Sequence, residues 1–161
     1  MSVSLFHLAQ VNVARMLAPL DSPVMAGFVA LLPTVNAEAD RSPGFVWRLE
    51  TPDGDATSIR AFEDPMILVN MSVWESVEAL KDFVYRSGHI VPLRERAQWF
   101  ERPQQAHLAM WWIPAGHIPT VEEARERLEH LRTHGPSAFA FTFTASFAPP
   151  ATAVVEAATS S

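Results

Sequence analysis

The chain lacks cysteine, so its 161 residues form no disulfide, Cys-ligated zinc site, iron–sulfur cluster or thiol nucleophile. It also lacks an excess of positive charge, because 12 Lys and Arg stand against 18 Asp and Glu, a formal net charge of −6. A nucleic-acid surface needs clustered cations, so this balance argues against such a partner. No run of about 18 apolar residues predicts a membrane span, and no signal peptide is evident. We therefore expect a cytoplasmic protein that does not bind membranes.

Packing must supply the stability that disulfides do not. The composition is 48% hydrophobic and 19% charged, and a chain of roughly 150 residues buries about 68–70% of its unfolded surface. We expect one domain over residues 1–148. The Ala, Thr and Ser of residues 149–161 show no apolar period and predict a disordered tail.

Alternation and short apolar runs predict strands at residues 4–13, 44–50, 66–74 and 107–113. In the second strand, Phe45 and Trp47 are expected to share one face. Apolar residues at helical spacing predict helices after Ser22, Trp74 and Thr120, with Gly88 breaking the second. Four phenylalanines spaced through residues 139–147 predict a further strand with an aromatic face, and residues 51–64 predict a loop.

The order of these elements contains a βαββαβ unit, which predicts an α+β fold with a ferredoxin-like antiparallel sheet and helices on one face. The third strand, residues 66–74, is apolar on both faces. Helices that cover one face leave the other exposed, and a soluble monomer rarely tolerates so large an apolar patch. We therefore expect a homodimer that pairs sheet to sheet.

Two stretches resemble a known family. The first, ILVNMSVWESVEALKDFVYRSGH over residues 67–89, is similar to the strand–helix block of dimeric α/β-barrel proteins, among them antibiotic-biosynthesis-type and haem-degrading monooxygenases. The second, AMWWIPAGHIPTVEEARERLEHLRTHGPSAFAFTF over residues 109–143, resembles the family catalogued as domain of unknown function 3291, together with YRSGH and WFERP. This second resemblance extends over about residues 4 to 147.

The resemblance implies a dimeric α/β barrel with a pocket for a hydrophobic small molecule. It favours a small-molecule enzyme, with cofactor-independent oxygenation of an aromatic or polyketide-like substrate as the leading reaction. Cyclisation or isomerisation in the same pocket is the alternative enzyme class, and a non-catalytic dimeric binding or stress-response module is the alternative outside enzymes. Haem binding is the least favoured, because His89 lies fifteen residues beyond Trp74, against about eleven for the ligating histidine in the haem-degrading relatives.

Asn70 and Trp74 lie on one face of a predicted strand with Ser72 between them. The pair resembles the Asn and Trp that orient an aromatic substrate in cofactor-free monooxygenases, so we assign both to catalysis: Asn70 to hold an oxyanion and Trp74 to stack. Asn12, with Gln10 on the same face of the first strand, is the nearest match to a first-strand asparagine of these enzymes and is assigned to substrate binding. The alternative is a core strand with one buried amide at the dimer seam.

His89 is the third catalytic candidate, because imidazole titrates near neutral pH and can act as general acid or base. It follows Tyr85 and Arg86, which we assign to substrate binding, since a guanidinium recognises a carboxylate or phenolate. The alternative for His89 is a structural hydrogen bond at the end of the helix. None of the six histidines forms an HxH or HExxH pattern, so we predict no metal site and no cofactor.

Trp111 and Trp112 are consecutive in a predicted strand, so one indole points to each side. We assign Trp111 to the substrate pocket; the alternative is that both fill the core and the dimer interface. Thr120 and Glu123 have the spacing of a capping box, in which each side chain caps the backbone amide of the other. Glu123 and Arg127 have the spacing of a helical ion pair.

Overall fold

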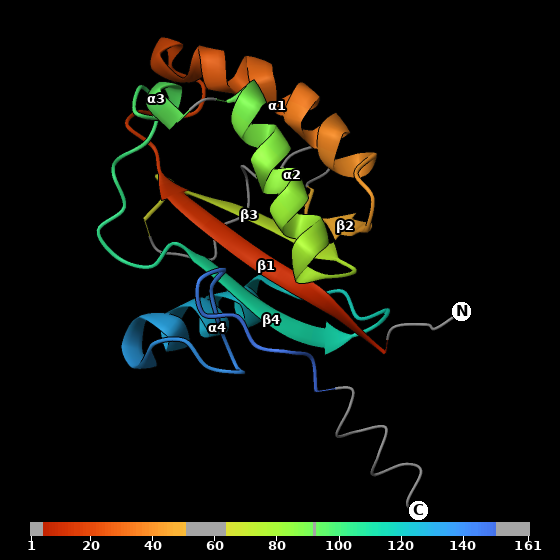
Figure 1. Cartoon of the computed structure of the whole chain (residues 1–161). Helices are drawn as coiled ribbons and strands as arrows, with labels where there is room; N and C mark the ends of the chain where they lie inside the picture. The colour runs from red at the N-terminus through yellow and green to blue at the C-terminus, as the bar shows by residue number, and fades with distance from the viewer. Residues whose placement is uncertain (1–4, 51–63, 92, 151–161) are drawn as a thin grey trace, which may run out of the picture.

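The computed structural model describes residues 5–50, 64–91 and 93–150 (Figure 1). The predicted loop at 51–64 and the predicted tail at 149–161 therefore lie almost wholly outside the described residues. In chain order the elements are β1 (Phe6–Arg15), a 3-10 helix (Pro23–Met25), α1 (Ala26–Asp40), β2 (Phe45–Arg48), β3 (Ile67–Trp74), α2 (Val77–Ile90), α3 (Leu93–Arg96), β4 (Leu108–Pro114) and α4 (Val121–His134).

The four strands form one antiparallel sheet in the order β2-β3-β1-β4. With a helix between β1 and β2 and another between β3 and β4, this is the ferredoxin-like arrangement. The α+β prediction is confirmed. The longest strand, β1, is an inner strand that pairs with both β3 and β4, and its side chains from Leu8 to Val11 are buried on both faces of the sheet.

Helices cover both faces of this sheet within one chain. Helices α1 and α2 lie side by side over one face, the α1/α2 face, and α4 lies against the opposite face, the α4 face (Figure 1). The structure thus places α1 and α2 on one face, as expected, and adds α4 on the other.

The α4 face is closed without a partner chain. Val11, Met71 and Trp111 are each no more than 1% exposed there, packed in one cluster with Leu128 of α4. We expected a homodimer because one apolar face of the sheet would be left uncovered. Within the described residues, α4 covers that face. Homodimer formation remains a prediction, and sheet-to-sheet pairing on this face requires α4 to move away.

The α1/α2 face carries two separate apolar clusters. One, at the start of β1 and the end of β3, contains Leu8 and Trp74 beneath Leu80 of α2. The other, at the far end of the same strands, contains Met16 with Trp99. The strand positions between the two clusters carry polar side chains.

A β-bulge in β2 changes which of its residues share a face. Phe45 pairs with Trp74 and Trp47 with Val73, so the extra residue between them turns their side chains to opposite faces. The prediction that Phe45 and Trp47 share a face is wrong. Arg48, opposite Ser72, consequently lies on the α1/α2 face.

Two further local predictions fail. Helix α2 continues through Gly88 to Ile90, because tertiary packing overrides the weak helix propensity of one glycine. In the aromatic segment at 139–147, the described pairing is a single bridge between Phe141 and Met110 of β4, not a strand.

The starts of the helices follow from their caps. Ser76 accepts a hydrogen bond from the backbone N–H of Ala79 at the start of α2, over 3.1 Å. Thr120 accepts one from the N–H of Glu123 at the start of α4, over 3.0 Å. The predicted cap is thus confirmed on the threonine side, whereas the carboxylate of Glu123 hydrogen-bonds elsewhere.

Gly44, between α1 and β2, has φ +85° and meets α2 so closely that a Cβ atom there would lie 2.6 Å from the Cβ of Ala79. Gly116 has a similar φ, +94°, but nothing lies within 4 Å of its Cβ position. We expect Gly116→Ala to cost about 1–3 kcal/mol from backbone strain alone, and Gly44→Ala to cost about 1–3 kcal/mol more from overpacking. Urea unfolding of both variants measures the difference, and equal losses would show that α2 yields freely to the added methyl group.

Candidate functional site

Three polar side chains on the α1/α2 face, Gln10, Asn70 and Ser72, form a hydrogen-bonded group that we call the amide–hydroxyl cluster. The Gln10 Nε2 atom donates to Asn70 Oδ1 over 2.9 Å and to Ser72 Oγ over 2.8 Å. The indole Nε1 of Trp74 also donates to Ser72 Oγ, over 2.8 Å. One indole and one carboxamide therefore converge on a single hydroxyl oxygen.

The strand register produces this cluster. Gln10 lies opposite Ser72 and Asn12 lies opposite Asn70, in the antiparallel pair of β1 and β3. Residues two apart on a strand share a face, so all four side chains lie on the α1/α2 face, in the polar zone between its two apolar clusters. Asn12 thus adjoins the cluster, and its role in substrate binding remains a prediction.

The cluster runs from a buried end to an accessible one. Gln10 and Ser72 are 4% and 6% exposed and Trp74 is fully buried. In contrast, Asn70 is exposed and Asn12 is half-buried. The cluster is therefore open to solvent at the two asparagines.

The Trp74 ring is held by two aromatic contacts and one hydrogen bond. Its indole stacks on Phe83 with centroids 5.1 Å apart, and Phe45 meets it edge to face at 5.4 Å. The polar edge of the indole points to Ser72. In this arrangement Trp74 contributes its N–H to the cluster, whereas the stacking we predicted for it requires a free ring face.

His89 and Tyr85 lie on the outer side of α2. Their rings are 5.0 Å apart, His89 is exposed, and Tyr85 is 64% exposed. The side of α2 that faces the sheet carries Leu80, Phe83 and Ser87. The structure therefore does not bring His89 together with Asn70 and Trp74.

Arg86 joins the two helices of the α1/α2 face. Its guanidinium donates to the Ser42 hydroxyl over 3.0 Å and lies 3.5 Å from the carboxylate of Glu38, near the end of α1. The hydroxyl of Ser42 in turn donates to the backbone carbonyl of Glu38 over 2.6 Å. This network gives Arg86 a structural task, which the assignment to substrate binding did not include.

Trp111 lies on the opposite face from the cluster. It is fully buried, and its Nε1 donates to the carboxylate of Glu123 over 2.9 Å, while the Nε2 of His117 lies 2.9 Å from the other carboxylate oxygen. Trp112 points to the α1/α2 face and donates to the carbonyl of Phe147 over 2.8 Å. The prediction that the two indoles point to opposite sides is confirmed.

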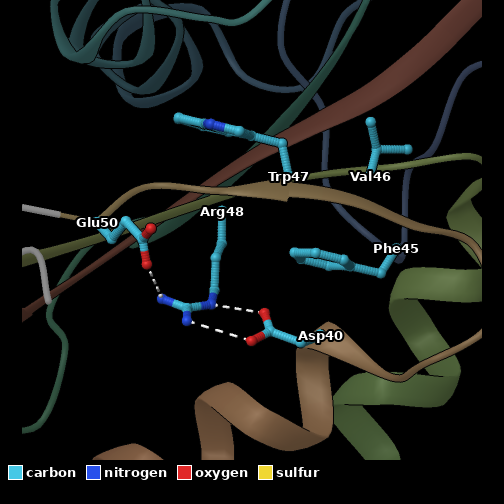
Figure 2. A pocket seen from close by; sticks show the side chains of 6 residues that line it. All are labelled: Asp40, Phe45, Val46, Trp47, Arg48 and Glu50. Carbon is cyan, nitrogen blue, oxygen red and sulfur yellow. Dashed lines mark hydrogen bonds and ion pairs between the residues drawn. The ribbon is translucent and has the colours of Figure 1, made fainter. Parts of the chain in front are cut away.

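A shallow pocket of about 320 Å³ lies at β2, the edge strand, beside the cluster. Figure 2 shows Arg48 in this pocket between Asp40, 2.8 Å away, and Glu50, 3.3 Å away. The hydrogen bond with Asp40 is the main reason that the pKa of Arg48 is raised, against the opposing effect of burial. Sequence reasoning missed Arg48, because its place beside Ser72 depends on the bulge in β2.

Sequence reasoning also gave no role to Ser72, although it lies between the two residues singled out on β3. The signal was present, since Gln10 and Asn12 on the same face of β1 indicated a row of polar positions. Neither the described histidines nor the described carboxylates gather into a group of three that could bind a metal ion. In the same part of the chain, no helix is long and apolar enough to cross a membrane.

Glu123 provides a test of the α4 face. Burial opposes its ionisation, but hydrogen bonds from His117 and Trp111 outweigh burial and lower the pKa of its carboxyl from the usual 4.5. Because the folded pKa is the lower one, the carboxylate stabilises the fold above pH 4.5, and this contribution is lost as the pH falls through the folded value. We expect Glu123→Gln to lower the free energy of unfolding by about 1 kcal/mol at pH 7, with a smaller difference from wild type at pH 3.

The measurement is urea unfolding of wild type and variant at both pH values. Glu126→Gln removes an exposed carboxylate from the same helix and serves as the control. If Glu123→Gln lowers the free energy of unfolding equally at both pH values, the charge of Glu123 does not strengthen its hydrogen bond with Trp111.

No curated protein matches this chain. Among solved structures, a provisionally assigned antibiotic biosynthesis monooxygenase from Nitrosomonas europaea superposes with a TM-score of 0.43 and 12% identity, over 73% of this chain and 96% of that one. The cofactor-independent oxygenase SnoaB from Streptomyces nogalater gives 0.41 and 17%, over 70% and 95%. The NE2512 protein of unknown function from Nitrosomonas europaea gives 0.42 and 12%, over 72% and 97%. Scores this low assign no activity to the chain.

The sequence itself is matched by a family model over nearly its whole length. The model is the one described as Domain of unknown function (DUF3291), and it matches residues 7–157. The match includes all four strands of the sheet except the first residue of β1, and all four α-helices. The chain therefore belongs to the DUF3291 family.

Proposed function

We propose that the α1/α2 face binds an aromatic small molecule through a carbonyl or phenolic oxygen, and that the protein oxygenates this molecule without a bound metal or organic cofactor. The observation that carries the proposal is the amide–hydroxyl cluster, which places polar hydrogen-bonding groups between two apolar clusters. Ligand sites commonly combine apolar walls with a few polar groups of this kind.

Oxygenation of this type makes modest demands on the protein. An aromatic ketone with an acidic CH₂ group loses a proton to a base, either a solvent base or His89 as predicted, and gives an enolate that is electron-rich enough to reduce O₂. The net change converts the CH₂ group and O₂ into a C=O group and water. The protein must bind the molecule, stabilise the enolate oxygen and keep it oriented, and carboxamide and hydroxyl groups do this where negative charge develops.

Asn70 is the first contact in this proposal, because it is both exposed and hydrogen-bonded into the cluster. Asn12, opposite it on β1, is the second. Trp111 lies on the other face, and Tyr85 lies on the outer side of α2, so contact of either with the same ligand needs a rearrangement. Arg86 already contacts Ser42 and Glu38 near the C-terminal end of α1, so it can contact a ligand only if there is room for one beside these two partners.

Binding without turnover is the second candidate function. It is favoured by one observation: within the described residues, the cluster's hydrogen bonds join only neutral side chains, with no histidine or carboxylate among them. Such a group binds an acceptor oxygen but supplies no general base. Measurement of O₂ consumption separates this candidate from oxygenation.

Replacing Asn70 by Ala tests the proposal. With 1,8-dihydroxyanthrone as the probe, we expect wild type to accelerate O₂ consumption and quinone formation, and Asn70→Ala to lower kcat/KM about a hundredfold through loss of an oxyanion contact. The variant also leaves one N–H of the buried Gln10 side chain unpaired, so we expect it to lower the free energy of unfolding by about 1–3 kcal/mol, and turnover is compared at a temperature where both proteins are folded. Asn36→Ala, which removes a half-buried amide from α1, is the control. Binding of the probe without accelerated O₂ consumption would support the second candidate instead.

His89 is tested separately as a general base. If it takes the substrate proton, as we predicted, His89→Ala loses turnover but keeps binding and stability, and a change at exposed Tyr85 beside it alters the pH profile. Its place on the outer side of α2 predicts the alternative, in which turnover of the same anthrone is unchanged. Steady-state O₂ consumption between pH 5 and 9, with His134→Ala as a matched exposed control, distinguishes the two.

A further inference from the structure

We infer that the hydrogen bonds of the amide–hydroxyl cluster are donated in one fixed direction, in which Trp74 and Gln10 position the Ser72 hydroxyl as a donor. Ser72 and Asn70 together then select the ionised form of a ligand oxygen bound to them. The inference deepens the proposed function and rests on it. It gives Ser72 a ligand contact, and it makes Gln10 and Trp74 positioning residues.

This direction of hydrogen-bond donation starts at Trp74. An indole nitrogen only donates, so the 2.8 Å contact between Trp74 Nε1 and Ser72 Oγ uses one lone pair of the hydroxyl oxygen. The Gln10 Nε2 atom donates to the same oxygen and uses the second lone pair. With both lone pairs occupied, the Ser72 proton must point away from both nitrogens.

No acceptor for the Ser72 proton occurs among the hydrogen bonds within the described residues. Ser72 is nevertheless 6% exposed, so this donor lies almost wholly out of bulk water. A buried donor without a partner costs free energy, and a ligand oxygen removes that cost. Two N–H groups that donate to one hydroxyl also polarise it and strengthen the bond it can donate.

Asn70 supplies the second donor. Its Oδ1 accepts from Gln10 Nε2, so its own NH₂ group is the end of the carboxamide directed away from that bond. Ser72 and Asn70 lie two residues apart on the same face of β3, close enough for the single nitrogen of Gln10 to contact both side chains. The two donors are thus placed to meet one ligand oxygen or two neighbouring ones.

A pair of donors discriminates between the charge states of that oxygen. Hydrogen bonds donated to the charged form of a group favour ionisation, and the cluster itself contains no carboxylate to oppose it. The charged groups that β2 brings to this face are Arg48, opposite Ser72, and its partners Asp40 and Glu50, so the cation there is already paired with two carboxylates. A phenol or enol bound here should therefore ionise at a lower pH than it does in water. The ligand class that fits is an aromatic phenolate or enolate, in preference to its neutral form.

Gln10→Glu reverses the direction with almost no change of shape. A carboxylate at position 10 only accepts, so it draws the Ser72 proton and the Asn70 NH₂ group toward itself and removes both donors from the ligand. Gln98→Glu adds the same charge at an exposed position outside the cluster and controls for net charge. Ser72→Ala removes one donor directly and serves as a second variant if Gln10→Glu folds poorly.

The experiment uses the full chain and two probes. The indicator dye alizarin reports ionisation through its visible spectrum, and the neutral ketone 9-fluorenone reports occupancy through tryptophan quenching. For wild type and Gln98→Glu we expect alizarin to ionise about one pH unit lower when bound, corresponding to about tenfold tighter binding of the phenolate. In Gln10→Glu the shift in the ionisation of alizarin should vanish or reverse. In Ser72→Ala and Trp74→Phe this shift should become smaller, and fluorenone should still bind to both variants.

Two results would overturn the inference in different ways. If both probes bind wild type but bound alizarin ionises at the same pH as in water, the donor pair is refuted while the binding site stands. The same conclusion follows if Gln10→Glu keeps the shift in the ionisation of alizarin. If neither probe binds wild type, the proposed function fails and the inference fails with it. Loss of the shift in Trp74→Phe at unchanged fluorenone affinity identifies a positioning effect that a purely structural tryptophan does not produce.

Discussion

Burial of β1 on both sides is the constraint on which the rest of the molecule depends. It pairs with β3 on one edge and β4 on the other, with α1 and α2 over one face and α4 over the other. The side chains buried in the middle of the strand must therefore pack or find a hydrogen-bond partner. Leu8, Ala9 and Val11 pack, whereas Gln10 in the same stretch is bonded across the sheet to β3.

A buried carboxamide is costly unless its polar atoms are paired. The cost at Gln10 is offset by partners on β3 that only the register of β1 against β3 supplies. A shift of one residue would turn Gln10 to the α4 face, toward the apolar side chains of Met71 and Trp111. The polar cluster therefore specifies strand register as well as forming the candidate site, and the same three residues serve stability and binding.

The sequence predicted those features that depend on local pattern. Alternation identified β1, β3 and β4, and the cap at Thr120 was visible as a residue type. The bulge in β2 was not predictable, because one extra residue leaves no trace in a four-residue strand. The outward position of His89 follows from the phase of α2, in which Phe83 faces the sheet and Val84 is exposed. The link from Gln10 to Ser72 required the register, which spacing along the chain does not contain.

The order of the elements along the chain has a consequence for synthesis. The last strand, β4, ends at Pro114, but the helix that covers the α4 face is not complete until His134. On the ribosome the sheet therefore emerges with one apolar face bare, including Val11, Met71 and Trp111, until about twenty more residues follow. During that interval the nascent chain presents a surface that chaperones recognise, and truncation before α4 leaves that surface exposed permanently.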